Sequence, residues 1–78
     1  MIEYTLKFNV NPYDPDVKMS MWWPSYISER FLGLPEIDEN GNTIYTMKFI
    51  FGEQYLQEFE SHIQTLKNFI IYSEKSQL

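Results

Sequence analysis

The side chains best suited to chemistry are the single histidine and its neighbours. His62 follows Glu58 by four residues, the spacing that brings two side chains together on one face of a helix. A general base also needs further polar groups around a substrate pocket, and the sequence indicates no such set. Ser61 is adjacent to His62, so on a helix it does not face the imidazole. The sequence therefore predicts no catalytic residues and no enzyme activity, with His62 as a packed or rim residue.

Metal and cofactor sites are not indicated either. The chain has no cysteine and one histidine, whereas the common zinc sites need several such ligands. Residues 38–42 (Asp-Glu-Asn-Gly-Asn) carry oxygen atoms at alternate positions, as a calcium loop does. A helix-loop-helix calcium site needs Gly at its sixth position and Glu at its twelfth, but here Gly41 is fourth and Phe49 is twelfth. Asn40-Gly41 is instead the strongest short signal for a hairpin turn.

Aromatic residues make up 18% of the 78 residues and supply the best candidates for contact with a partner. Trp22 and Trp23 are adjacent on an expected strand, so their side chains point to opposite faces of a sheet. The alternation places Trp23 in the core and leaves Trp22 outside, near Tyr26 and Tyr13. Exposed Trp and Tyr side chains are typical anchors of protein interfaces. The alternative is that a short helix or the Pro-rich loop covers the Trp pair and Tyr26.

Acidic residues dominate the middle of the chain. Eleven acids and six bases give a formal net charge of −5, and residues 29–60 alone account for that excess. Nucleic-acid affinity comes mainly from Lys and Arg, so this charge disfavours nucleic acid and suits a protein partner with a basic surface. The alternative is that the acids only keep the protein soluble. The candidate partner-binding acids are Glu36, Asp38, Glu39 and Glu53.

Hydrophobic patterns predict an α+β fold with the order ββαββα. Apolar residues alternate over 2–10 and again over 17–23, and the Pro-, Asn- and Asp-rich segment between them predicts a turn. Antiparallel pairing with Val10 opposite Val17 would put both apolar sets on one face. Pro24 ends the second strand, and a short helix is expected over 26–32, ending at Gly33.

The second half predicts another hairpin and a long helix. Strands are expected over 34–38 and 43–51, with Ile37 facing Ile44 and with Leu34 on the core side. Residues 53–73 have apolar side chains at intervals of three and four, which predicts one long amphipathic helix across a face of a four-stranded sheet. Phe69, Ile71 and Tyr72 lie outside the stripe of that helix. They predict either a homodimer contact or packing against the amino-terminal hairpin.

These features favour a single small domain over residues 1–78 that acts through protein contacts. No segment approaches the roughly 18 apolar residues of a membrane span, and we expect a cytoplasmic protein. The leading functional interpretation is a non-enzymatic protein-interaction module. It includes a phage or mobile-element inhibitor of a host defence protein that works by surface occupation or acidic mimicry. The alternatives are a sheet protein that binds single-stranded nucleic acid and a homodimer that binds a small ligand.

Overall fold

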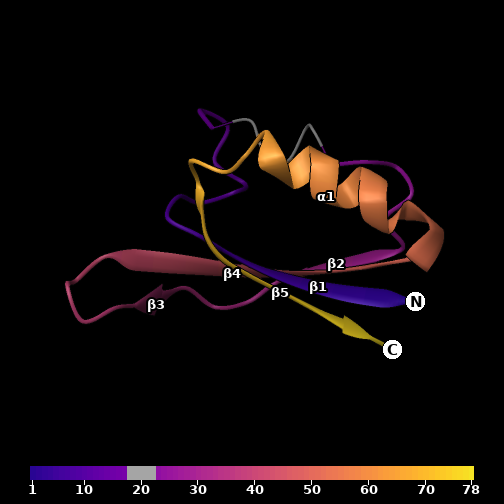
Figure 1. The fold of residues 1–78 in the computed structure, drawn as a ribbon. Helices are drawn as coiled ribbons and strands as arrows, with labels where there is room; N and C mark the ends of the chain where they lie inside the picture. The colour runs from indigo at the N-terminus through magenta and orange to yellow at the C-terminus, as the bar shows by residue number, and fades with distance from the viewer. Residues whose placement is uncertain (18–22) are drawn as a thin grey trace.

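A computed structural model of the chain describes residues 1–17 and 23–78. The sheet is antiparallel and has the order β2-β4-β1-β5, with β3 also paired to β4. A small α+β domain is confirmed, but the predicted ββαββα order is wrong. The elements are β1 (Ile2–Phe8), β2 (Glu29–Leu32), β3 (Glu36–Ile37), β4 (Thr43–Phe51), the 3-10 helix η2 (Glu53–Tyr55), α1 (Leu56–Gln64) and β5 (Ile70–Gln77), as Figure 1 shows.

The long helix predicted over 53–73 is a short helix followed by a strand. α1 ends at Gln64, the chain turns over 65–69, and β5 pairs with β1. Thr65 helps to end the helix, because its Oγ1 donates a hydrogen bond to the His62 carbonyl at 2.6 Å. The following residues, Ile70 to Tyr72, are β-branched or aromatic and favour a strand. The helical spacing of apolar residues was therefore a true signal only as far as Leu66.

The predicted amino-terminal hairpin is also wrong. The two strands that pair with β1 are β4 and β5, which lie on either side of it. Tyr4, for example, has Phe49 on one side and Lys75 on the other. Most of the predicted second strand, residues 18–22, lies outside the described residues. Alternation in β1 indicates a buried face, but it does not say which strand supplies the neighbour.

The short helix predicted over 26–32 is replaced by a turn and by β2. The Ile27 N–H donates to the Pro24 carbonyl at 3.3 Å, and the Ser28 N–H donates to the Ile50 carbonyl at 2.8 Å. β2 then pairs with β4, and all four of its residues are exposed. An isolated helix turn with no buried face gains little, whereas this segment gains a ladder along β4.

The hairpin predicted across Asn40-Gly41 forms, but its register differs by one residue. Ile37 pairs with Thr43, not with Ile44. The loop holds three residues between Asp38 and Asn42, whose backbones are joined by a 2.9 Å hydrogen bond. Gly41 has a φ of 83°, the left-handed conformation that the last residue of such a loop needs. This loop length sets the observed register.

The core lies between the sheet and α1, which covers one sheet face (Figure 1). Phe59 of α1 is fully buried, and its ring centroid is 4.6 Å from that of Phe51 and 5.0 Å from that of Tyr4. Trp23 is buried, as the alternation predicts. The buried set is Ile2, Tyr4, Leu6, Phe8, Trp23, Met47, Phe49, Phe51, Phe59, Ile63 and Leu66. Most of the aromatic excess is therefore packing.

A polar link joins the helix to two strands at the margin of this core. The Tyr4 hydroxyl donates to Glu60 Oε2 at 3.1 Å, and Lys75 Nζ lies 3.3 Å from the same oxygen. Burial, together with the hydrogen bond and the negative charge of Glu60, raises the pKa of Tyr4 to about 12. Tyr4 therefore stays protonated in the folded protein at pH values where an unfolded tyrosine ionises.

We expect this link to make the folded state sensitive to alkali. Between pH 10 and about pH 12 the folded protein keeps the Tyr4 proton that the unfolded chain loses, so the free energy of unfolding falls as pH rises. One such group changes stability by at most about 1.4 kcal/mol per pH unit. Urea titrations at pH 9, 10, 11 and 12 should show a shallower decline for Tyr4→Phe than for the wild type. Equal declines would contradict the assignment.

Candidate functional site

The longest exposed stretch of the described chain is residues 28–42, which we call the β2–β3 edge. It contains β2, β3 and the hairpin loop, and it forms one side of the sheet next to β4. Large apolar side chains are exposed along it: Leu34 at 89%, Ile37 at 73% and Phe31 at 52%, with Leu32 also exposed. Apolar side chains gathered in this way on a surface are typical of interaction sites.

The local sequence explains why these side chains face solvent. The Gly33 N–H still donates to the Thr46 carbonyl at 2.9 Å, but Pro35 has no N–H with which to continue the ladder. The interruption separates β2 from β3 and directs Leu34 away from the sheet. The expectation that Leu34 lies on the core side is wrong. Pro35 within an apolar run was the signal for an interrupted edge strand.

Acidic side chains surround the exposed apolar residues of the β2–β3 edge. Glu29, Glu36, Asp38 and Glu39 are all exposed, and Arg30 is the basic residue of the stretch. Asp38 also holds the loop, because its Oδ1 accepts hydrogen bonds from the backbone N–H of Asn40 at 2.9 Å and of Asn42 at 2.8 Å. The structure therefore brings together three of the four acids that the sequence singles out.

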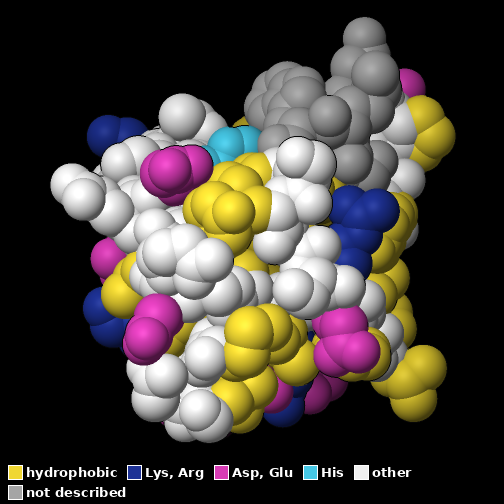
Figure 2. All heavy atoms as spheres, turned by 90° about the vertical axis from the view of Figure 1, so that its right-hand side faces the viewer, with side chains coloured by type: hydrophobic (Ala, Val, Ile, Leu, Met, Phe, Trp, Pro, Cys, Tyr) yellow, Lys and Arg dark blue, Asp and Glu magenta, His cyan; other side chains and the backbone are white. Residues whose placement is uncertain are grey.

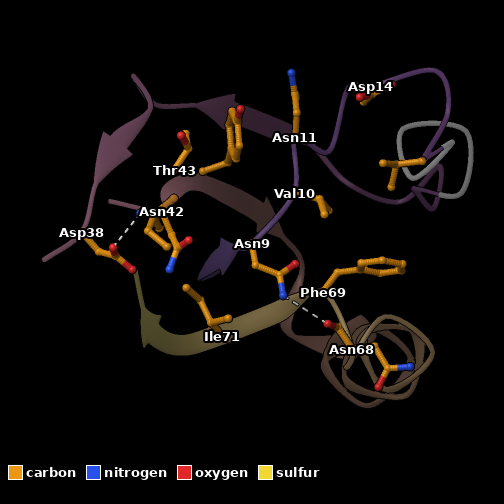
Figure 3. A pocket seen from close by; sticks show the side chains of 13 residues that line it. Asn9, Val10, Asn11, Asp14, Asp38, Asn42, Thr43, Asn68, Phe69 and Ile71 are labelled. Atoms are coloured by element: carbon orange, nitrogen blue, oxygen red, sulfur yellow. Dashed lines mark hydrogen bonds between the residues drawn. The ribbon is translucent and has the colours of Figure 1, made fainter. Parts of the chain in front are cut away.

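A pocket of about 820 Å³ adjoins the hairpin and shares Asp38 and Asn42 with it. Figure 3 shows Asp38 and Asp14 on different sides of this pocket. The described residues that line it include no Lys, Arg or His, so its formal charge is negative. Its lining consists of Asn9, Val10, Asn11, Asp14, Val17, Asp38, Asn42, Thr43, Ile44, Tyr45, Asn68, Phe69 and Ile71.

Many polar groups of the pocket also hold the surrounding turns. Asn11 Oδ1 accepts a hydrogen bond from the Tyr13 N–H, and Asp14 Oδ1 accepts one from the Asp16 N–H, both at 2.9 Å. Asn9 Nδ2 donates to the Asn68 carbonyl at 3.4 Å, drawn as a dashed line in Figure 3. The remaining carboxylate oxygens give the pocket acceptors for a cationic group.

The three aromatic contact candidates have different places. Trp22 lies outside the described residues. Tyr26 is half-buried, with its ring stacked on Tyr55 at 4.5 Å between centroids, and burial together with the charge of Glu58 raises the pKa of its hydroxyl. Tyr13 is exposed in the loop after β1. Tyr26 therefore contributes to packing at the opposite end of the sheet from the hairpin.

Glu53 is separated from the other acids of the predicted set. It lies in η2, at the end of the sheet opposite the hairpin tip that carries Asp38 and Glu39 (Figure 1). Figure 2 views the molecule from the η2 side, and the carboxylates on that face stand apart from one another. The acidic residues of the sequence therefore do not form one continuous surface on this face.

The residues predicted for self-association are not on a helix. Phe69 is half-buried in the turn before β5, whereas Ile71 and Tyr72 are exposed on β5 itself. Ile71 is the extra residue where the β1–β5 register shifts, and it lines the pocket. Lys7 Nζ lies 5.5 Å from the centroid of the Tyr72 ring, on the sheet face opposite α1. These residues thus mark the second edge of the sheet.

His62 packs against the core. Its ring lies 5.6 Å from that of Trp23 in an edge-on arrangement. Within the described part of the chain, the buried Nε2 atom of His62 has no hydrogen-bond partner. Burial lowers the pKa of His62 from its ordinary value of 6.5. The neutral imidazole is therefore the form that fits the folded protein.

We expect mild acid to destabilise the protein through His62. Below pH 6.5 the unfolded chain binds a proton at His62 that the folded protein binds less readily. The contribution of His62 to the free energy of unfolding is therefore fully present above pH 6.5 and is lost as the pH decreases. His62→Gln removes this titration. Urea unfolding at pH 7.5, 6.5 and 5.5 should show a decline in the wild type that the variant lacks. A variant that declines in parallel with the wild type would contradict this role.

Residues 1–17 and 23–78 contain no helix that is long and apolar enough to cross a membrane, and no group of three or more potential metal ligands. Comparison of the chain with protein-family models, with curated proteins and with solved structures gives no match.

Proposed function

We propose that this chain is a cytoplasmic, non-enzymatic protein-interaction module whose partner docks on the β2–β3 edge. The observation that carries the proposal is the exposure of Phe31, Leu34 and Ile37 on one short stretch framed by acids. Apolar anchors inside a polar rim are the usual anatomy of a protein interface. The partner is expected to present an apolar depression with basic residues around it.

Side chains, more than added strand pairing, are expected to supply the affinity. β2 has four residues and β3 has two, and Pro35 interrupts the backbone between them. Short strands and proline are devices that limit strand addition at a sheet edge. Leu34 has the most exposed of these apolar side chains and is therefore the leading candidate for a central anchor.

Charge supports a basic partner. The four acids of the β2–β3 edge outnumber Arg30, and the adjoining pocket adds Asp14 without any basic lining residue among those described. Such complementarity increases the association rate and weakens with salt. Asp38→Asn is an informative variant, because the amide oxygen can still accept the two backbone hydrogen bonds while the charge is lost. It should slow association without opening the hairpin.

One form of this proposal is an inhibitor of a host defence protein, encoded by a phage or mobile element, that works by occupying its target's surface. The separation of Glu53 from Asp38 and Glu39 favours surface occupation over mimicry of a continuous line of phosphates. Trp22→Ala tests independently whether that residue adds a second contact.

Site-directed photocrosslinking tests the docking surface. The chain has no cysteine, so Leu34→Cys and Gln57→Cys each create one attachment point for a benzophenone maleimide. Gln57 is exposed on α1, away from the β2–β3 edge, and serves as the matched control. We expect a specific adduct in the native cell from position 34 alone. The captured protein, once purified, should bind the wild-type chain more weakly as salt increases. Equal adducts from both positions would overturn the proposed surface.

A second candidate function is binding of single-stranded nucleic acid on the sheet face opposite α1. Phe31 stands opposite Lys48 across β2 and β4, and Lys7 lies beside the Tyr72 ring. Exposed aromatic rings can stack on bases while lysines contact phosphates. Glu74, which accepts a 2.7 Å hydrogen bond from the Tyr72 hydroxyl, counts against it. Filter binding of single-stranded nucleic acid over a salt series tests this function, with Tyr72→Ala as the control variant. Binding that persists in Tyr72→Ala, or that does not depend on salt, would exclude a nucleic-acid site on this face.

A further inference from the structure

The second edge of the sheet differs from the β2–β3 edge in length and protection. β5 is eight residues long, and within the described chain it pairs with β1 alone. It contains no proline or glycine, and all its residues after Ile70 are exposed. Natural sheets usually shorten, charge or cover such an edge, because its free backbone groups can pair with another strand. β5 has one lysine, and Glu60 holds it toward α1.

The ladder with β1 shows which backbone groups of β5 point outward. The Leu78 N–H donates to the Met1 carbonyl at 2.9 Å, so positions 1 and 78 form a hydrogen-bonded pair. Antiparallel ladders alternate between hydrogen-bonded and non-hydrogen-bonded pairs. Ser73, Lys75 and Gln77 are therefore in the non-hydrogen-bonded positions relative to β1. Their N–H and carbonyl groups point away from the sheet, where a further strand can accept and donate hydrogen bonds.

We propose that a second copy of this chain occupies the outer edge of β5, through antiparallel β5–β5 pairing about a two-fold axis at Ser73. A two-fold axis perpendicular to the sheet keeps the same face of both copies on the same side. Residues that pair across the axis must then have their side chains on the same face of the sheet. Successive side chains of a strand point to opposite faces, so the axis must pass through a residue position and not between two positions. Axes at Ser73 and at Glu74 give the longest overlap along the strand.

Charge selects between these two arrangements. An axis at Glu74 places two carboxylates directly opposite each other, which is destabilising for a cross-strand pair. An axis at Ser73 places two small hydroxyl side chains opposite each other and pairs Tyr72 with Glu74 of the other copy. Lys75 then faces Ile71 of the other copy. This register has no like-charge pair and gives the outward groups of Ser73 a reciprocal pair of hydrogen bonds.

The dimer joins the two sheets into one and leaves each β2–β3 edge free at the far ends. The inference therefore does not rest on the proposed function, and each can fail alone. It also keeps the self-association predicted for Ile71 and Tyr72, although through a strand and not through a helix end. The two edges of the sheet thus have different occupants.

Solution mass measures the dimer directly. The chain has a mass of 9.4 kDa, and light scattering at increasing concentration should approach twice that mass. Ser73→Lys places two ammonium groups at the axis, with Lys67 lining the same small pocket as Ser73. It should give 9.4 kDa at every concentration, whereas Gln57→Lys, with the same charge change on α1, should dimerise like the wild type. A wild-type mass of 9.4 kDa up to about 1 mM would overturn the proposal.

Single cysteines test the register. Residues in a hydrogen-bonded pair have Cα atoms about 5.5 Å apart, within the range a disulfide spans. Ser73→Cys should therefore crosslink rapidly on oxidation. Ser76→Cys is the matched control, because in this register its two copies are offset by six residues, roughly 20 Å. Faster crosslinking of Ser76→Cys than of Ser73→Cys would overturn the axis at Ser73.

Discussion

Phe59→Ala is expected to remove most of the protein's stability. The Phe59 ring is fully buried and is the main contact of α1 with the sheet, packing on Tyr4, Phe49 and Phe51. Truncation of a buried Phe costs about 3–5 kcal/mol, because the surrounding side chains cannot close the cavity. A single core in fewer than about 80 residues supplies only about 3–5 kcal/mol in total. The variant should therefore populate the unfolded state at 25 °C.

Urea unfolding followed by circular dichroism measures this loss, and Phe31→Ala provides the matched control. Phe31 has the same side chain but is 52% exposed on β2, so its truncation should change stability by no more than about 0.5 kcal/mol. Comparison of the two variants separates the effect of burial on stability from the effect of removing a phenylalanine side chain as such. A Phe59→Ala variant that loses less than about 1 kcal/mol would contradict the placement of α1 against the sheet, because a buried aromatic ring cannot be removed at so small a cost.

Leu34→Arg is expected to have the opposite profile: a large loss of binding with little change in stability. Leu34 is 89% exposed, so its replacement leaves no cavity. If it is a central anchor for a basic partner, the variant loses the apolar contact and adds a repulsive charge. Loss of a hot-spot residue costs about 2 kcal/mol or more, which is roughly thirtyfold in affinity.

Calorimetry with the partner captured by crosslinking measures the affinity of Leu34→Arg, and thermal melting measures its stability. Gln57→Arg makes the same charge change on α1, at an exposed residue away from the β2–β3 edge. It should bind within about threefold of the wild type, since surface charges outside an interface act mainly through long-range steering. Wild-type affinity in Leu34→Arg, or an equal loss in Gln57→Arg, would show that the partner docks elsewhere.

The parts of the fold with unambiguous local patterns were predictable from the sequence. β1 alternates without interruption, so its buried face, including Tyr4 and Phe8, was correctly predicted. The burial of Trp23 was also correctly predicted. Each of these residues belongs to a segment whose period matches one kind of element and whose side chains reach one core.

The prediction of one long helix over residues 53–73 failed because a helix and the strand after it together showed one apparent helical spacing of apolar residues. Leu56, Phe59, Ile63 and Leu66 follow a helical spacing, and Ile70 continues it by chance. Whether the chain after Leu66 remains helical depends on which state is more stable: more helix, or a strand paired with β1. β1 starts more than sixty residues earlier in the sequence. A local window contains no information about a strand that distant in sequence, and tertiary pairing overrides weak local propensity.

The candidate site was likewise only partly predictable from the sequence. The acids Glu36, Asp38 and Glu39 and the turn at Gly41 were visible in the sequence. The exposure of Leu34 was not, because the alternation of the expected strand placed this residue on the core side. Leu34 is exposed because Pro35 interrupts the edge strand, and the buried core does not include this segment.

Composition and short-range order by themselves determined an acidic, cysteine-free α+β chain with one strongly alternating strand, one hairpin turn and a single aromatic core. The tertiary structure alone decided that β1 lies between β4 and β5, that β5 replaces the end of a helix, and which two edges of the sheet are unpaired within the described residues. The reason is that alternation specifies a face, whereas strand neighbours are chosen by long-range hydrogen bonding and burial. Those open edges carry the candidate contacts of this protein.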